Sequence, residues 1–358
     1  MEDHLYSNNF KNGEKEEGET QETNFQFNFE ADNIEEKDNI YKLEAIKLMK
    51  WNKMVGKFDE YLDKSNKSKY KKLKERTKRG VPECFRGYIW QVFAGVDNYR
   101  KNGNYYQMLK ESSKEEQLTD PEKEILKDLD RTIPNSTFFK DKYGLGQRSL
   151  FHVLSTFSRL STETGYVQGM SFFTACLLNH MDEESAFWML YIIMEKYKIN
   201  GFFKKDFPEL NKAFYKLLCL LKKICPKIYE CFKTHGLSPS MYASQWFLTL
   251  FFVNVKYEVF LRIFDLFLLG KSSKTIYRFG LALLKLNEEK ILNTKLFDEL
   301  MIIIKHLDDK IDVEKLCDEA MKMKFSNKTL LEYEKQYENL RMNNLSDEIL
   351  DQSNFNGN

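Results

Sequence analysis

From Gly80 onward, hydrophobic residues recur every three or four positions in short segments that are separated by polar breaks. This spacing is typical of amphipathic helices, and few stretches show the strict alternation that strands require. The predicted helices cover residues 85–93, 105–111, 121–130, 147–161, 170–179, 183–197, 209–223, 228–233, 242–252, 257–267, 274–287, 295–307, 313–323 and 328–341. No fixed repeat length recurs, which disfavours a regular solenoid. We therefore predict an all-α fold.

The first 80 residues differ from the rest in charge. Residues 1–40 hold twelve acidic residues and three lysines, so we expect a disordered acidic tail there. Residues 41–80 hold fourteen Lys and Arg against five Asp and Glu. Apolar residues with helical spacing predict a basic N-terminal helical extension over residues 41–78. The polar residues 341–358 are expected to form a flexible C-terminal tail.

Composition excludes several classes of protein. The 358-residue chain has a net charge of +1, which argues against a dedicated nucleic-acid binder. We expect a cytoplasmic protein, because there is no secretory signal and no apolar run long enough to span a membrane. The six cysteines form no CxxC pair and the five histidines are scattered, so we expect no metal site. The basic residues 64–79 could form a nucleic-acid or membrane patch, although a solvated helix end is the favoured interpretation.

Two short segments carry candidate chemistry. The sequence contains no phosphate-binding GxxxxGK[ST] loop, GxSxG elbow or kinase signature, so the chain holds no recognisable nucleotide cradle or nucleophile of its own. In the first segment, Pro134 ends a predicted helix and leaves Arg131 at the junction of helix and loop. Asp128, one turn earlier, can pair with Arg131 and fix the direction of its guanidinium group.

The second segment presents Gln168 between Gly165 and Gly169, just before a predicted helix. Taken alone, an Asp–Arg pair on a helix is usually a weak surface ion pair, and a glutamine between glycines is usually a loop hydrogen-bonder. Together, an arginine and a glutamine offered from loops are the two groups that phosphoryl transfer from GTP requires. Arginine neutralises the charge that develops on the phosphate, and the glutamine amide orients the attacking water.

These segments belong to an ordered set of motifs: residues 79–82 (RGVP), 125–134 (IxxDxxRTxP), 165–170 (GYVQGM), 186–188 (AFW), 245–251 (QWFLTLF), 262–267 (RIFDxF) and 279–285 (FGLALLK). The set resembles the TBC domain of Rab GTPase-activating proteins. The resemblance is close over residues 79–290 and predicts a TBC domain over residues 79–340. Departures such as Val81 for isoleucine and Phe264 for tryptophan do not touch the two candidate segments.

The resemblance implies an all-helical, two-lobed fold in which Arg131 is an arginine finger and Gln168 a glutamine finger. Asp128 would orient Arg131, and the remaining finger-supporting residues are Ile125, Thr132, Pro134, Tyr166, Gly169 and Met170. A further set is expected to be structural or partner-facing, with the structural role favoured: Arg86, Trp90, Trp246, Phe247, Arg262 and Asp265.

The implied function is to accelerate GTP hydrolysis by a Rab-family small GTPase in its GTP-bound form. The chain would have no independent enzymatic reaction and no cofactor of its own, because GTP and magnesium come with the GTPase. The alternative is a non-catalytic Rab-binding scaffold of the same fold in membrane trafficking. Peripheral association with organelle or vesicle membranes is compatible with either function, and no nucleic-acid partner is expected.

Overall fold

The computed structural model describes residues 34–112, 117–133, 136–162 and 164–343. Within these ranges the regular structure is entirely helical, with nineteen α-helices and no strand, so the all-α prediction is confirmed. The expectations for residues 1–33 and for residues 344–358 lie outside the described residues. Residues 34–40, which the sequence analysis assigns to the acidic tail, belong to the first described helix.

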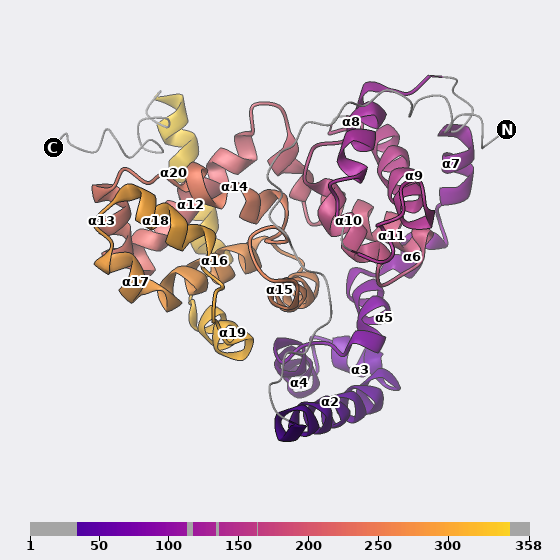
Figure 1. The fold of residues 1–358 in the computed structure, drawn as a ribbon, viewed down its shortest axis with the longest axis horizontal. Coiled ribbons are helices and arrows are strands. Elements are labelled where there is room, and N and C mark those ends of the chain that lie inside the picture. Colours follow the sequence, from indigo (N-terminus) through magenta and orange to yellow (C-terminus); the bar gives the residue numbers. More distant parts are fainter. Residues whose placement is uncertain (1–33, 113–116, 134–135, 163, 344–358) are drawn as a thin grey trace.

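Three helices precede the two lobes of the molecule: α2 (Ile34–Val55), α3 (Phe58–Leu62) and α4 (Lys67–Lys78). Trp51 and Met54 on α2 and Phe58 on α3 are buried, and Leu73 anchors α4 in the same way. The predicted basic extension is therefore helical and packs through an apolar stripe. In Figure 1 these helices lie below the first lobe, with α4 beside α15 (Tyr257–Gly270).

The first lobe is built around α9 (Leu145–Leu160), whose Leu150, Val153, Leu154 and Phe157 are fully buried at helical spacing. The other helices of this lobe are α5 (Glu83–Ala94), α6 (Val96–Arg100), α7 (Tyr105–Ser112), α8 (Asp120–Leu129), α10 (Met170–Leu178) and α11 (Glu183–Tyr191). Helices α7, α8, α10 and α11 all pack against α9. This arrangement brings the end of α8 and the start of α10 to one side of the lobe (Figure 1).

The second lobe follows two short irregular helices, a π-helix (Ile192–Lys196) and a 3₁₀-helix (Ile199–Phe203). Its helices are α12 (Pro208–Ile224), α13 (Pro226–Thr234), α14 (Pro239–Leu248), α16 (Lys274–Leu286), α17 (Glu288–Asn293), α18 (Phe297–Lys305), α19 (Val313–Lys322) and α20 (Asn327–Met342). Helix α15 packs against α4, α5, α16 and α19 and so joins the lobes. No described helix is long and apolar enough to cross a membrane.

Two predicted helices differ from the observed ones. The helix expected over residues 242–252 ends at Leu248, because Leu250 and Phe251 adopt positive φ angles of 52° and 72° and are buried in a turn. The helix expected over residues 183–197 is α-helical only to Tyr191 and then widens into the π-helix. An apolar run can be buried as a turn as readily as in a helix, so periodicity alone does not distinguish them.

Candidate functional site

The first candidate segment ends α8 as the sequence predicts. Ile125 is fully buried on the inner face of the helix, and the Thr132 hydroxyl donates to the Asp128 carbonyl oxygen at 2.6 Å. This bond satisfies one of the carbonyl groups that a helix end leaves free. Arg131 follows the last turn with half of its side chain exposed. Pro134 lies outside the described residues.

The buried Asp128 carboxylate connects the two candidate segments. One carboxylate oxygen forms an ion pair with the Arg131 guanidinium group, and the other accepts the Tyr166 hydroxyl at 2.5 Å. Asp128 is only 3% exposed, so water competes little for these contacts. Burial and the Asp128 carboxylate raise the pKa of Tyr166, which keeps its hydroxyl protonated as a donor. Tyr166 lies two residues before Gln168 and thereby ties the glutamine loop to the end of α8.

The Gln168 loop depends on an unusual backbone conformation at its last residue. Gly169 has a φ of 109°, and a Cβ atom added there would meet Thr249 and the Leu248 carbonyl only at ordinary contact distances of 3.5 and 3.6 Å. The backbone angle, and not lack of space, therefore requires glycine. Met170 is fully buried and begins α10, whereas the Gln168 side chain is exposed and forms no hydrogen bond with another described residue.

A second buried ion pair fixes the other end of α8. Both oxygens of Glu122 accept from the Arg159 guanidinium group of α9 at 2.9 Å. The Glu122 carboxylate also accepts the Thr119 backbone N–H at 2.8 Å, and Thr119 caps the helix in return. These residues are not among the predicted site residues, although Thr-x-x-Glu ahead of an apolar run is a recognised helix-start signal. The direction of α8, and hence the position of Arg131, is set at both ends.

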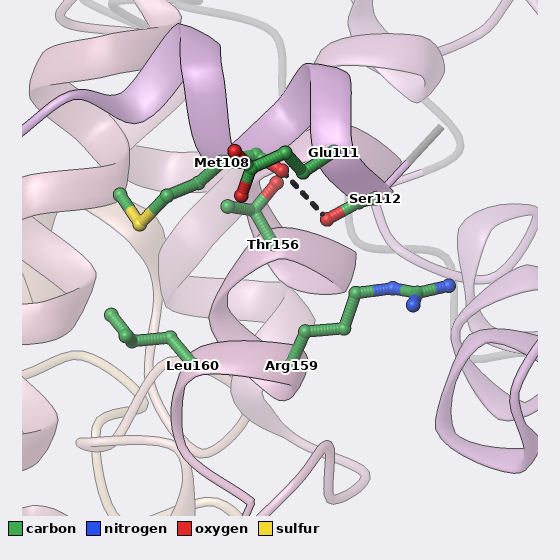
Figure 2. A pocket seen from close by; sticks show the side chains of 6 residues that line it. All are labelled: Met108, Glu111, Ser112, Thr156, Arg159 and Leu160. Atoms are coloured by element: carbon green, nitrogen blue, oxygen red, sulfur yellow. Dashed lines mark hydrogen bonds between the residues drawn. The ribbon is translucent and has the colours of Figure 1, made fainter. Parts of the chain in front are cut away.

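An open hollow of about 290 Å³ lies between α7 and α9 (Figure 2). Its lining residues are Met108, Glu111, Ser112, Thr156, Arg159 and Leu160. None of the residues predicted from the sequence lines it. Neither Arg131 nor Gln168 lines this hollow, and the Arg159 guanidinium group in its wall is paired with Glu122.

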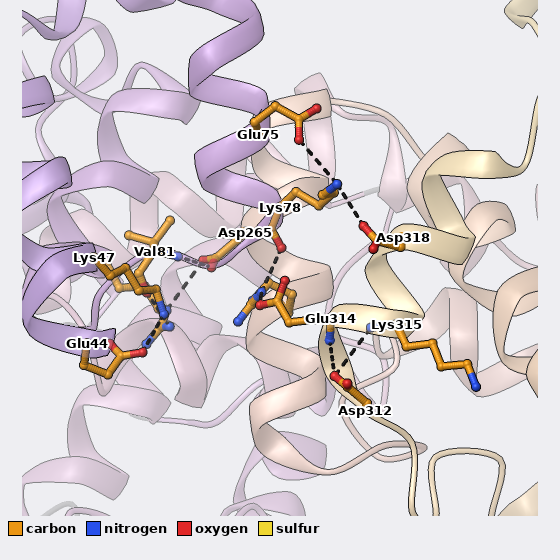
Figure 3. A network of polar contacts seen from close by, with 12 residues as sticks. Glu44, Lys47, Glu75, Lys78, Val81, Asp265, Asp312, Glu314, Lys315 and Asp318 are labelled. Carbon is orange, nitrogen blue, oxygen red and sulfur yellow. Dashed lines mark hydrogen bonds and ion pairs between the residues drawn. The ribbon is translucent and has the colours of Figure 1, made fainter. Parts of the chain in front are cut away.

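Three of the residues expected to be structural or partner-facing meet at one buried carboxylate. Asp265 on α15 is fully buried and accepts Trp90 Nε1 at 2.7 Å and the Val81 backbone N–H at 3.0 Å. The Arg86 Nε atom lies 3.5 Å from the same carboxylate. This network, seen in part in Figure 3, joins α5 to α15. Its burial favours the structural role.

The other three residues of that set also pack inside the molecule. Trp246 and Phe247 on α14 are 2% and 0% exposed. Arg262 on α15 donates to the Lys78 carbonyl oxygen at 2.8 Å and pairs with Glu314 at 2.7 Å. Figure 3 shows Lys78 between Glu75 and Asp318, so the end of α4 is held against α19. These contacts connect elements and leave the exposed polar groups of the site to Arg131 and Gln168.

The fold and the site define a class of protein: an all-helical, two-lobed domain in which a buried carboxylate holds an arginine at a helix end, beside a loop that exposes a glutamine. The chain belongs to the RabGAP-TBC family, because the Rab-GTPase-TBC domain model matches residues 83–292. The matched range lies inside the predicted domain, residues 79–340.

Related proteins and structures agree with this assignment. The chain is 30% identical to the human ecotropic viral integration site 5 protein homolog, over 87% of this chain and 37% of that protein. It is 36% identical to mouse TBC1 domain family member 4, over 77% of this chain and 21% of that protein. The chain thus spans less than two fifths of the length of these curated relatives.

Two solved structures share the fold. The flagellar RabGAP TBC domain of Chlamydomonas has a TM-score of 0.64 at 24% identity, covering 78% of this chain and 94% of that one. The Ypt/Rab-GAP domain of Gyp1p has a TM-score of 0.58 at 20% identity, covering 70% of this chain and 91% of that one. At these identities the likeness concerns the fold alone.

Proposed function

We propose that this protein accelerates GTP hydrolysis by a Rab-family small GTPase and supplies Arg131 and Gln168 in trans. The observation that carries the proposal is the shared Asp128 carboxylate, which holds a half-exposed Arg131 and, through Tyr166, the loop of the exposed Gln168. A relative that matches over 81% of this chain is named Rab GTPase-activating protein tbc-11, from Caenorhabditis elegans. The partner would be the GTP-bound form, since only that form presents a phosphate for transfer.

In this mechanism, the attacking water and the transferring phosphate belong to the GTPase site. The Arg131 guanidinium group would stabilise the negative charge that builds on the phosphate oxygens, and the Gln168 amide would orient the water for in-line attack. Arginine fingers raise such rates by about 10³ to 10⁵, which corresponds to about 4 to 7 kcal/mol of barrier. Asp128 would restrict the rotamers of Arg131 before contact, so less entropy is lost when the two proteins meet.

The remaining parts of the proposal follow from this chemistry. GTP and magnesium would come with the GTPase, and the chain would need no cofactor of its own. The setting would be the cytoplasmic face of organelle or vesicle membranes, with this protein as a peripheral component in intracellular trafficking.

The test is a hydrolysis screen across GTP-loaded Rab proteins with finger variants. Arg131→Ala and Gln168→Ala should each lower the stimulated rate by at least about 10³ on the responding Rab, because each removes a group required only in the transition state. Matched controls are Arg341→Ala at the end of α20 and Gln107→Ala on α7, which remove exposed side chains of the same types elsewhere. Both controls should keep the wild-type rate.

Two outcomes would contradict the proposal. Full stimulation by both finger variants would show that other residues act. Tight binding of a GTP-loaded Rab by the wild-type protein with no change in hydrolysis rate, across the whole panel, would favour the non-catalytic scaffold instead.

A further inference from the structure

A group of basic side chains lies where α15 ends and α16 begins, and none of its members belongs to the finger segments. We call Lys64, Lys271, Lys274 and Arg278 the basic cluster. Lys274 Nζ lies 5.2 Å from the centroid of the Phe325 ring, and Arg278 Cζ lies 5.9 Å from the same centroid. Lys271 precedes Lys274 by three residues across a turn, and the positive charge of Lys64 lowers the pKa of Lys271. Residues 271–278 therefore supply three of the cations, and Lys64 comes from a second segment of the chain.

The basic cluster has no acidic partner among the described residues. Among the residues that the structure describes, none of its four members forms an ion pair, and the buried Arg278 Nε atom has no hydrogen-bond partner. Two other partly buried lysines of this molecule are paired: Lys78 with Asp318 and Lys212 with Glu338. Lys274 and Arg278, which are also partly buried, differ from these two lysines in having no acidic partner among the described residues.

The surroundings of Lys271, Lys274 and Arg278 disfavour the charged state of these side chains. Burial lowers the pKa of Lys271, Lys274 and Arg278. Repulsion from Lys64 lowers the pKa of Lys271 further, and repulsion from Arg278 does the same for Lys274. A partly desolvated cation without a counter-charge destabilises the folded state, and like charges nearby add to that cost. A bound anion would supply the missing counter-charge and offset the repulsion between the cations.

The chemistry of the basic cluster selects the kind of anion. A guanidinium group and several ammonium groups together suit phosphate oxygens, to which they donate charge-assisted hydrogen bonds. Lys274 and Arg278 lie one turn apart on α16 and both contact the Phe325 ring, so their cationic surface is short and suits a small ligand better than a long polyanion. A phosphate monoester carries a charge of about −1.5 to −2 at neutral pH, so two or three such groups balance four positive charges.

We propose that the basic cluster binds a compact anion with two or three phosphate groups, such as an inositol bisphosphate or trisphosphate. The shared chemistry covers both a free inositol phosphate and the headgroup of a phosphoinositide lipid. The start of α16 also lies here, with the Ser272 hydroxyl oxygen accepting the Lys274 backbone N–H at 3.2 Å, and the partial positive charge of that helix end adds to the cluster. The proposal is independent of the proposed function, because it involves neither finger.

The test is a calorimetric titration of the full chain with soluble inositol trisphosphate at low and at moderate salt. The wild-type protein should bind, more weakly as salt increases. The double variant Lys274→Gln/Arg278→Gln should bind at least about tenfold more weakly, because it loses two charge-assisted contacts. The control Lys227→Gln/Lys290→Gln removes two exposed lysines on α13 and α17 and should bind as the wild type does. Thermal unfolding of each variant verifies that it is folded.

Vesicles distinguish the source of the phosphates. Sedimentation with vesicles that contain phosphatidylinositol bisphosphate, compared with phosphatidylserine vesicles of matched total charge, identifies a lipid headgroup if only the former retain the wild-type protein. Binding of the soluble trisphosphate without vesicle retention identifies a free ligand. The proposal is overturned if the wild-type protein does not bind the trisphosphate at low salt, or if the cluster variant and the control variant bind equally well. Stimulated GTP hydrolysis in solution, without lipid, should not change in the cluster variant.

Discussion

At the scale of single residues, Tyr166 does the most to determine whether Arg131 and Gln168 act together. Its hydroxyl occupies one Asp128 oxygen while Arg131 occupies the other, so the carboxylate cannot rotate without breaking one of these contacts. Tyr166 does not itself reach a reacting atom in the proposed mechanism. It is a positioning residue, and it acts on both fingers at once.

Removal of that hydroxyl by Tyr166→Phe should lower the stimulated rate about tenfold, since one hydrogen bond to a charged group is lost. The GTPase concentration for half-maximal stimulation should change little, because the surface of the protein keeps its shape. The measurement is single-turnover hydrolysis against GTPase concentration. The control is Tyr242→Phe on α14, whose buried hydroxyl has no hydrogen-bond partner among the described residues. Equal rates for the wild type and Tyr166→Phe would remove Tyr166 from the mechanism.

The sequence predicts residue types at the site better than it predicts their partners. The Asp128–Arg131 pair is visible because both residues lie on one helix turn. The Tyr166–Asp128 bond spans 38 positions and depends on how α8 and α10 pack against α9, which no local pattern encodes. The same holds for Asp265, whose partners Val81 and Trp90 are more than 170 positions away.

At the scale of elements, side-chain contacts fix α8 at both of its ends. Arg159→Leu should destabilise the fold by about 3 to 5 kcal/mol, because it leaves the buried Glu122 carboxylate without its counter-charge. The double variant Arg159→Leu/Glu122→Leu removes both buried charges and should recover much of the lost stability. Urea unfolding followed by circular dichroism measures the stability of the single and the double variant. The exposed Lys123–Asp120 pair on the same helix is the control, and Lys123→Ala should change stability little.

Helix boundaries show where sequence patterns suffice and where they fail. The α8 prediction, residues 121–130, is within one residue of Asp120–Leu129, because apolar spacing and a following proline agree. The short helices α6 and α17 were not predicted, since a five- or six-residue helix shows too few periods of hydrophobic spacing. The sequence of helix α4 is itself strongly polar, yet its buried Leu73 and Thr77 are enough to hold the helix in place.

At the scale of the whole molecule, the two lobes are joined by buried polar contacts as well as by apolar packing. Asp265 connects α15 to α5, and Arg262 on the same helix connects it to α4 and α19. In each lobe, a carboxylate forms a further polar contact that holds neighbouring helices together. Glu183 on α11 accepts the Tyr105 hydroxyl of α7 at 2.7 Å, and Glu334 on α20 accepts from Lys216 of α12 at 2.6 Å.

These carboxylates predict how the whole molecule responds to acid. Burial opposes ionisation of Glu183, but hydrogen bonds from His152, Ser149 and Tyr105 outweigh it and lower its pKa below the ordinary value of 4.5. Burial likewise opposes ionisation of Glu334, and Lys216 and Lys212 lower its pKa. A carboxylate with a depressed pKa stabilises the fold above the unfolded pKa, and that stabilisation is lost as the pH falls through the folded pKa.

The free energy of unfolding should therefore be nearly constant between pH 7 and about pH 5 and should fall as the pH drops below 4.5, in both lobes together. Urea unfolding at a series of pH values measures this profile. Glu183→Gln keeps the shape of the side chain but does not titrate, so the variant should be less stable at neutral pH and should lose less stability in acid than the wild type. A profile of the same steepness in both proteins would mean that Glu183 has the same pKa folded and unfolded, and that other carboxylates cause the acid response.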